Sequence, residues 1–493
     1  MPVHLAPLFR RAAFVLLLPI VLLGCATSTN FITGENQPAA YTWAEEVQIG
    51  QEADASIIAQ YGVYDNPELS AYVTRIGEEV LRQSALRQAP APPEVQNTPF
   101  TFRVLDSPVV NAFALPGGFI YVTRGLLAHL DNEAQLAMVL GHEVGHVAGR
   151  HASKRAAVQQ RNVIGLIGAA AAAEVFLGRG AQVLDVGGTG VQLLQLSYGR
   201  DDERESDQAG VAYAERAGWD GAEGAHFFTS LKRLQEQAGA SIPNFLSTHP
   251  DPGEREVTIR QLAAQYPTGT KINQAEFFRM IDGIVVGEDP RQGYTEGGSF
   301  YHPQLRFQFA YPVGWQVLNS AAAVQIGEPN GNAAMLFTFA EGNSAQEAGR
   351  AFAGQQGFTA TDQGAVRLNG LTAYRVTGTA ASEGGNLGVV SYHIDYDGNV
   401  YHFYGLATAN TFSTYSSAMD GAIRSFSRLT DSRYLNRDPI RLTITNAGRT
   451  APFSTLASRA NLPGGMDMLS LAIINQVDVN ETIQAGTPIK LTR

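Results

Sequence analysis

Cysteine is almost absent from this sequence, and that excludes a disulfide-stapled architecture. Cys25 is the only cysteine among 493 residues, so no disulfide framework can form within the chain. With 44% apolar and 16% charged residues, the composition is that of globular material able to bury apolar cores. The chain shows no obvious internal repeat, and its length predicts two to four domains at about 150 residues each.

The sequence also lacks an excess of positive charge and any very long apolar run. A formal net charge of −11 argues against nucleic acid as a partner. The apolar runs at 12–23 and 163–173 are both shorter than the roughly 20 residues that span a bilayer. The first follows two arginines and favours a cleaved targeting signal. For the second, a buried helical hairpin or a mobile flap over a cleft is favoured over a membrane span.

The targeting signal ends in Leu22-Leu23-Gly24-Cys25, which resembles the lipobox of bacterial lipoproteins. The resemblance implies cleavage before Cys25 and acylation of its thiol and new amino terminus, which holds a protein firmly to a membrane. Ala26, rather than an aspartate, follows, and this resembles signals sorted to the outer membrane. We therefore predict a signal peptide (1–24), a polar tether (25–40) and an outer-membrane lipoprotein facing the periplasm of a Gram-negative bacterium.

The feature around which the chain is organised is a pair of histidines, His142 and His146, with Glu143 directly after the first. Residues 133–140 are strong helix formers, so both imidazoles should lie on one helical face, about 5–6 Å apart at Cβ. Two such rings can reach one zinc ion, which keeps a position open for water in catalytic sites. Glu143 can take a proton from that water without being a ligand. The alternative is an ordinary core helix that happens to carry two histidines.

A third ligand should come from the acidic cluster Glu203-Arg204-Glu205-Ser206-Asp207, because two histidines do not complete a zinc site. By composition alone, such a run of charges is more often a solvated face. On a helix, Glu203 and Asp207 share one face while Glu205 points elsewhere. Spacing alone does not choose between the two faces.

The zinc helix, the segment 111–127 and the acidic cluster, in that order, resemble the gluzincin peptidases of the HtpX and CAAX prenyl protease family, in particular its soluble periplasmic BepA-like branch. This resemblance implies one Zn²⁺ per chain, held by His142, His146 and Glu205. It also implies that Asp207 hydrogen-bonds the first histidine ligand and fixes its tautomer.

The same resemblance extends to His249, in the stretch Ser247-Thr248-His249-Pro250. It implies either that His249 stabilises the oxyanion or that it caps the zinc as an inhibitory switch, and both roles suit an imidazole. His151 is expected at the surface, and His129 and His226 in the core or at the surface. Residues 119–123 are predicted to be a sheet edge to which an extended substrate adds as a strand.

The C-terminal half carries no catalytic constellation. Residues 276–298 are predicted to be a linker, and 299–430 resemble a PsbP/Mog1-type α/β sandwich that would serve as a binding or scaffolding module. Residues 439–493 have a βααβ pattern that resembles a degenerate LysM repeat. Because Gly448-Arg449-Thr450 replaces the usual Gly-Asp-Thr, peptidoglycan contact and a structural cap on the preceding domain both remain open.

The sequence thus predicts an α+β chain with a mainly helical zincin-type peptidase domain and a small β-sheet over residues 41–275. The predicted function is a zinc endopeptidase that hydrolyses misfolded or misassembled envelope proteins, with the lipid on Cys25 as its membrane contact. The alternative, from another class, is a periplasmic chaperone or cell-wall-binding lipoprotein whose zinc site is structural or capped.

Overall fold

The computed structural model describes residues 27–167, 198–238, 249, 252–266, 269–382, 385–464 and 466–493. The predicted signal, Cys25 and most of the predicted flap lie outside these residues. The described chain mixes helices and sheets, in agreement with the predicted α+β class. Within it, no helix is both long and apolar enough to cross a membrane.

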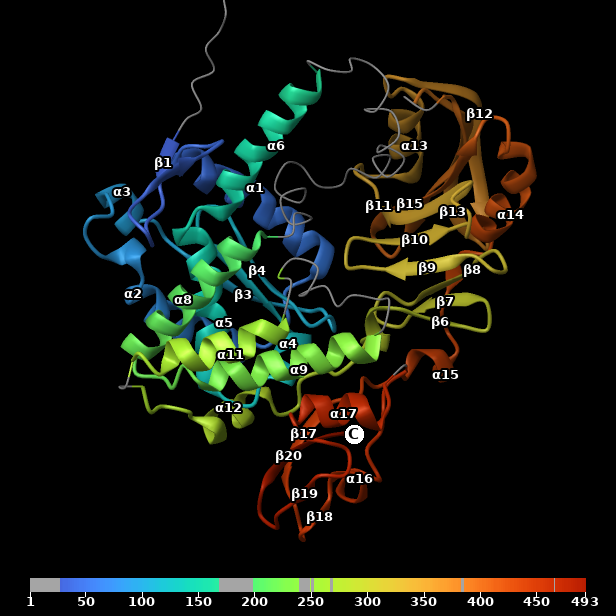
Figure 1. Cartoon of the computed structure of the whole chain (residues 1–493). Coiled ribbons are helices and arrows are strands. Elements are labelled where there is room, and N and C mark those ends of the chain that lie inside the picture. Colours follow the sequence, from blue (N-terminus) through green and yellow to red (C-terminus); the bar gives the residue numbers. More distant parts are fainter. Residues whose placement is uncertain are drawn as a thin grey trace, which may run out of the picture.

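The zinc helix α5 (Glu133–Ala148) lies at the centre of the N-terminal half, and every one of its residues is buried (Figure 1). It begins where the Asn132 side chain accepts a hydrogen bond from the backbone N–H of Gln135 at 2.9 Å, a typical N-cap. Around it lie the helices α1 (Trp43–Tyr61), α2 (Pro67–Arg82), α3 (Pro93–Gln96), α4 (Arg124–His129), α6 (His151–Ile167), α8 (Arg200–Arg216), α9 (Glu223–Ala238), α11 (Pro252–Ala263) and α12 (Gln274–Ile281).

Glycines allow α5 and α8 to pack unusually closely. A Cβ atom on Gly141 would lie 2.9 Å from the carbonyl oxygen of Gly210, and one on Gly210 would lie 2.9 Å from the backbone nitrogen of His142. A Cβ on Gly145 would lie 3.1 Å from the Cα of Ser206. These three positions therefore have room for hydrogen alone, and the acidic cluster of α8 comes directly against the histidines of α5.

The small sheet corrects one expectation about substrate binding. Its strands β3 (Thr101–Leu105), β4 (Ala112–Leu115) and β5 (Phe119–Thr123) have the order β3-β5-β4. β5 pairs with β3 in parallel and with β4 in antiparallel register. The predicted edge strand is thus the central strand, with both sides paired, and β4 is an edge that lies against α5.

The predicted tether is also partly ordered. β1 (Thr27–Thr29) and β2 (Asn36–Pro38) form an antiparallel hairpin that packs on the C-terminal end of the zinc helix. The backbone N–H of Phe31 donates to the carbonyl of Ala148 at 3.0 Å, and the Gln37 side-chain amide donates to the carbonyl of Gly149 at 2.5 Å. Carbonyls that the end of α5 leaves unpaired are satisfied in this way.

A β-rich domain follows, with helices on both faces of its main sheet (Figure 1). The helices are α13 (Ala345–Ala353), which packs on Tyr374 and Val376, and α14 (Phe412–Arg424), which packs on Val390 and Tyr392. The seven-stranded sheet has the order β12 (Phe358–Leu368), β13 (Leu371–Ala380), β14 (Leu387–Tyr396), β15 (Asn399–Thr408), β11 (Ala333–Phe339), β10 (Ala323–Gly327), β9 (Gln316–Asn319). A second sheet holds β16 (Ser427–Arg428), β8 (Phe307–Ala310), β7 (Ser299–His302) and β6 (Tyr294–Glu296).

The predicted linker is not a free spacer. It contains most of α12, and its residues Ile284 and Val285 are buried in the peptidase core. The backbone N–H of Val286 donates to the carbonyl of Ile440 at 2.8 Å, which ties this segment to the start of the C-terminal module.

The C-terminal module packs on the peptidase half rather than on the β-rich domain (Figure 1). It consists of β17 (Leu442–Asn446), β18 (Ala451–Pro452), α16 (Phe453–Leu456), α17 (Met468–Ile474), β19 (Thr482–Ile483) and β20 (Pro488–Thr492), and β17 pairs with β20. Lys490 is 1% exposed and reaches the loop before α5, where its Nζ lies 2.6 Å from Asp131 and donates to the carbonyls of Ala128 and Leu130. The module therefore covers the peptidase half and not the preceding domain, on which a structural cap was expected.

Candidate metal centre

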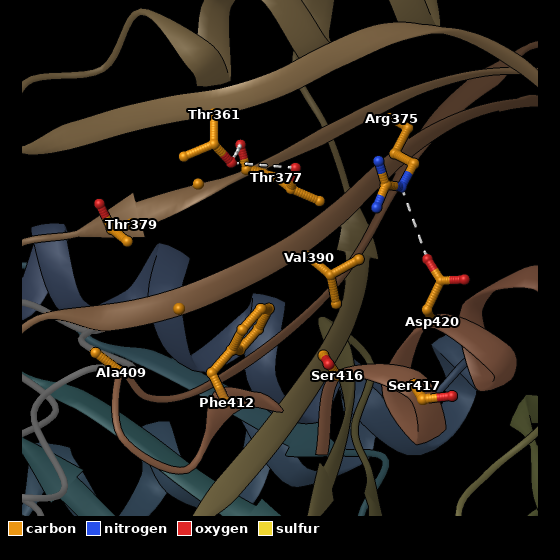
Figure 2. A pocket seen from close by; sticks show the side chains of 12 residues that line it. Thr361, Arg375, Thr377, Thr379, Val390, Ala409, Phe412, Ser416, Ser417 and Asp420 are labelled. Atoms are coloured by element: carbon orange, nitrogen blue, oxygen red, sulfur yellow. Dashed lines mark hydrogen bonds and ion pairs between the residues drawn. The ribbon is translucent and has the colours of Figure 1, made fainter. Parts of the chain in front are cut away.

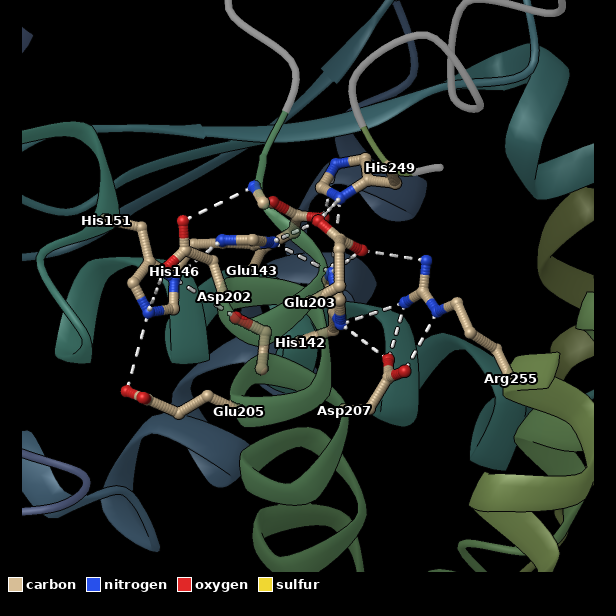
Figure 3. A network of polar contacts seen from close by, with 12 residues as sticks. His142, Glu143, His146, His151, Asp202, Glu203, Glu205, Asp207, His249 and Arg255 are labelled. Atoms are coloured by element: carbon tan, nitrogen blue, oxygen red, sulfur yellow. Dashed lines mark hydrogen bonds and ion pairs between the residues drawn. The ribbon is translucent and has the colours of Figure 1, made fainter. Parts of the chain in front are cut away.

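Four buried side chains converge on one point beside α5: His142, His146, Glu203 and His249 (Figure 3). Their donor atoms all lie within 4.8 Å of one another. The two histidines come from successive turns of α5, and the glutamate comes from the first turn of α8. His249 lies shortly before α11, more than a hundred residues beyond the zinc helix in sequence.

The distances between these donors fit one tetrahedral ion. Ligands about 2.0–2.1 Å from a tetrahedral zinc lie about 3.3 Å from each other. The Nε2 atoms of His142 and His146 are 2.9 Å apart. Glu203 Oε1 lies 3.5 Å from His146 Nε2, and Glu203 Oε2 lies 3.6 Å from His142 Nε2. His249 Nδ1 lies 3.3 Å from His142 Nε2 and 2.9 Å from Glu203 Oε1. It therefore fills the fourth corner of the site.

Glu143 lies next to this cluster and outside it. Among the residues that the structure describes, neither of its buried carboxylate oxygens has a hydrogen-bond partner, and His249 Nε2 is 3.8 Å from Oε1. A buried polar group without a partner is costly in a folded protein, and this one is explained if a water or a substrate group binds beside it. Burial raises the pKa of Glu143, which suits a group that accepts and returns a proton near neutral pH.

Glu205 is not at this centre, and the predicted third ligand is corrected to Glu203. The carboxylate of Glu205 lies 3.4 Å from His151 Nε2 and accepts a hydrogen bond from Asn30 at 2.5 Å. The reason is helical geometry: Glu203 and Asp207 share the face of α8 that meets α5, and Glu205 projects from another face. The family motif gave the right cluster and the wrong member of it.

Asp207 lies where the resemblance placed it, with Oδ1 3.0 Å from His142 Nδ1. The sequence gave no sign of its partner, Arg255 of α11, which is 5% exposed. The guanidinium contacts Asp207 at 2.5 Å and Glu203 at 2.9 Å. Burial acts to raise the pKa of both carboxyls, but the combined effect of nearby histidines and Arg255 exceeds it. Arg255 and His142 hold the pKa of Asp207 below its ordinary value, and His249, Arg255 and His146 hold that of Glu203 well below.

His151, expected at the surface, is fully buried, and its Nδ1 lies 2.9 Å from His146 Nδ1. Tyr198 stacks on the other side of the site, with its ring 3.8 Å from that of His146. Burial lowers the pKa of His146 well below its ordinary value, so this ring is neutral and can bind a metal. Neither contact could be found by helical spacing, because both depend on how the chain turns after α5 and before α8.

The β-rich domain has a pocket of about 550 Å³ beside α14 (Figure 2). Hydroxyl groups of Thr361 and Thr377 line it, and Arg375 lies 3.7 Å from Asp420 at one end. Across the described ranges of the chain, no group of three or more histidine, cysteine or acidic side chains gathers there as it does at α5. The chemistry that the structure supports is therefore concentrated in the N-terminal half.

A helix that carries two histidine donors and a base, completed by a glutamate from a second helix, is the arrangement of a zinc metallopeptidase. The family model described as "Peptidase family M48" matches residues 67–263, which include α5, α8 and His249. This match supports a zinc metallopeptidase of that family in the N-terminal half.

Relatives point the same way. The "Putative beta-barrel assembly-enhancing protease" of Vibrio cholerae is 31% identical over 210 residues, which are 42% of this chain and 41% of the relative. The "Beta-barrel assembly-enhancing protease" of Escherichia coli strain K12 is 27% identical over 238 residues, 47% of this chain and 46% of the relative. The "Mitochondrial metalloendopeptidase OMA1" of Arabidopsis thaliana is 32% identical over 158 residues, 32% and 30% of the two chains. The chain spans less than half the length of each of these relatives.

Proposed function

We propose that this protein is a zinc-dependent endopeptidase of the bacterial envelope that cleaves misfolded or misassembled envelope proteins. The observation that carries the proposal is the buried group of three candidate ligands, His142, His146 and Glu203, beside Glu143, whose carboxylate has no hydrogen-bond partner in the described part of the chain. The names of the relatives support the class of substrate. Anchoring through lipid on Cys25 is part of the proposal and follows from the lipobox resemblance.

Each residue has a distinct task. The three ligands hold zinc, which when bound polarises a peptide carbonyl and makes a water more acidic. Glu143 takes a proton from the attacking water and returns it to the leaving amine. Asp207 accepts from His142 and fixes the tautomer of that ring. Arg255 neutralises the two acidic groups of α8 and keeps both ionised.

We further propose that His249 caps the metal in the resting protein. Its Nδ1 stands at the fourth corner of the donor set, which a substrate carbonyl or water must occupy during catalysis. The His249 ring must then leave this corner before hydrolysis. Four protein donors around one ion are also typical of a structural zinc site, and this observation favours the second candidate function, a chaperone with a structural zinc.

The edge strand β4 is the proposed docking site for substrate, in place of the central strand β5. A polypeptide in extended form can add to an open edge through main-chain hydrogen bonds, which read little sequence. Ala114 and Leu115 of β4 line a small cavity together with His146. A strand added there would pass the metal.

The test compares the wild-type chain with Glu143→Gln, Glu203→Gln and Glu205→Gln on an unfolded protein substrate. We expect Glu143→Gln to bind zinc normally and to lose cleavage by about 10²–10⁴-fold, the usual contribution of a general base. Glu203→Gln should lose zinc, and Glu205→Gln should retain it at near-stoichiometric loading. Equal, slow cleavage by wild type and Glu143→Gln would contradict the proposed peptidase activity and favour the chaperone function.

His249→Ala separates the two roles of this histidine. If His249 caps the metal, the variant should cleave faster than wild type and keep its zinc. Slower cleavage with zinc retained would instead indicate that His249 stabilises the oxyanion.

A further inference from the structure

We infer that Asn30, Glu205 and His151 form a line of polar contacts that orients His146 for metal binding, so that the N-terminal hairpin is part of the metal centre. The inference rests on the proposed zinc site. It assigns a positioning role to three residues, one of which is the carboxylate that the sequence placed on the metal itself.

The contacts run in one line from the hairpin to the ligand, and Figure 3 shows the part of it from Glu205 through His151 to His146. The Asn30 amide nitrogen donates to Glu205 Oε1 at 2.5 Å, and Glu205 Oε1 lies 3.4 Å from His151 Nε2. His151 Nδ1 lies 2.9 Å from His146 Nδ1. The carboxylate of Asp202 adds negative charge 3.8 Å from the same His151 Nε2.

Metal binding by His146 fixes which nitrogen of each ring along this line carries the proton. If His146 binds the ion through Nε2, its proton must be on Nδ1, which lies 2.9 Å from His151 Nδ1 and can be donated to it. The Nδ1 of His151 must then be an acceptor, so its own proton is on Nε2 and faces Glu205 and Asp202. Both histidine ligands are therefore backed by a carboxylate, His142 directly through Asp207 and His146 through a second imidazole.

The turn after the zinc helix is built to place His151. Arg150 has a positive φ of 52°, an uncommon conformation for a side-chain-bearing residue. Its guanidinium is held by Glu46 at 2.6 Å and by the carbonyl of Tyr41 at 2.7 Å. A Cβ atom on Gly149 would lie 2.3 Å from the ring of His151, so only glycine lets that ring fold back beneath the ligand.

The hairpin end of the line is also fixed. Asn30 is 3% exposed, and its carbonyl oxygen accepts from the backbone N–H groups of Ile32 at 2.9 Å and Thr33 at 3.3 Å. These two bonds direct its amide nitrogen toward Glu205. The segment directly after Cys25 thus contributes a group that reaches the metal centre through two side chains.

The experiment measures zinc affinity by competition with a chelator, and the absorption spectrum of the Co²⁺-substituted protein. His151→Phe keeps a ring at this position and removes both ring nitrogens, and we expect zinc affinity to fall about 10–100-fold, as for other partners of metal ligands. His151→Gln can accept from His146 and donate to Glu205, so it should recover most of the affinity and a wild-type Co²⁺ spectrum. His226→Phe, at an exposed histidine of α9, is the matched control.

A double-mutant cycle tests whether Glu205 acts through His151. We expect Glu205→Ala to lower zinc affinity in the wild-type background and to have no further effect in His151→Phe, because the line is already broken. Glu205 is only partly buried, so this variant also covers the case in which His151→Phe fails to fold. Additive effects of the two substitutions, or unchanged affinity and Co²⁺ spectrum in both, would overturn the inference. A wild-type chain that binds zinc without cleaving protein would contradict the proposed function alone.

Discussion

Gly141 lies in α5 at the point where this helix, which carries the two histidine ligands, packs against α8, which carries Glu203. A methyl group there would meet the carbonyl oxygen of Gly210 at 2.9 Å and its Cα at 3.0 Å. Carbon atoms in comfortable contact are about 3.5–4.0 Å apart. Gly141→Ala should therefore push the helices about 0.5–1 Å apart, while zinc–ligand distances tolerate only about ±0.2 Å.

The expected result is a larger loss at the metal than in the fold. Overpacking costs about 1–3 kcal/mol, and replacing a helical glycine by alanine returns about 1 kcal/mol, so the free energy of unfolding of the metal-free protein should fall by about 0–2 kcal/mol. Zinc affinity should fall at least about tenfold, because Glu203 moves away from the two histidines by more than a coordination bond tolerates.

The assay is denaturant unfolding of the metal-free protein together with zinc affinity by chelator competition. Gly421→Ala is the matched control, since Gly421 lies within α14 with no heavy atom within 4 Å of its would-be Cβ. That control should gain about 1 kcal/mol of stability and bind zinc normally. If Gly141→Ala gains stability like the control and keeps wild-type zinc affinity, the account of the helix crossing is refuted.

Three further outcomes follow from the structure. Lys490→Met should destabilise the fold by about 3–5 kcal/mol in denaturant unfolding, because it leaves Asp131 buried without its partner. Adding Asp131→Asn should recover part of the loss, and no recovery would contradict a stabilising role for this ion pair. Burial lowers the pKa of His129, His302 and His393 from 6.5 to about 4. Because the unfolded chain therefore takes up protons at higher pH than the folded one, their contribution to folding stability is complete above pH 6.5 and is lost as the pH falls toward 4. Each represents about 3 kcal/mol at most, and unfolding curves between pH 7 and pH 4 that show constant stability would disprove this. Removing zinc with a chelator should lower Tm, because the folded chain loses about 4 kcal/mol of stability if zinc had been present at about 1,000 times its Kd. An unchanged Tm would indicate that the folded chain holds no ion.

Local patterns in the sequence were enough for the elements that depend on neighbours in the chain. The zinc helix and the shared face of Glu203 and Asp207 follow from helical periodicity, and the structure has both. Periodicity did not choose between the two faces of α8, and the choice of Glu205 as the ligand came from matching a motif; the packing of α8 on α5 places Glu203 there instead.

What the tertiary structure decided depends on contacts between segments far apart in the chain. Arg255 beneath the ligands, the edge position of β4 and the hairpin that brings Asn30 to Glu205 cannot be read from any single stretch. His151 shows the reason most clearly: a positive φ at Arg150 reverses its direction, and no helical projection of the sequence contains that turn. The sequence by itself determined that α5 carries two histidines and a base. Only the packing of α8, of α11 and of the N-terminal hairpin against α5 decided which groups complete the metal centre and hold it in place.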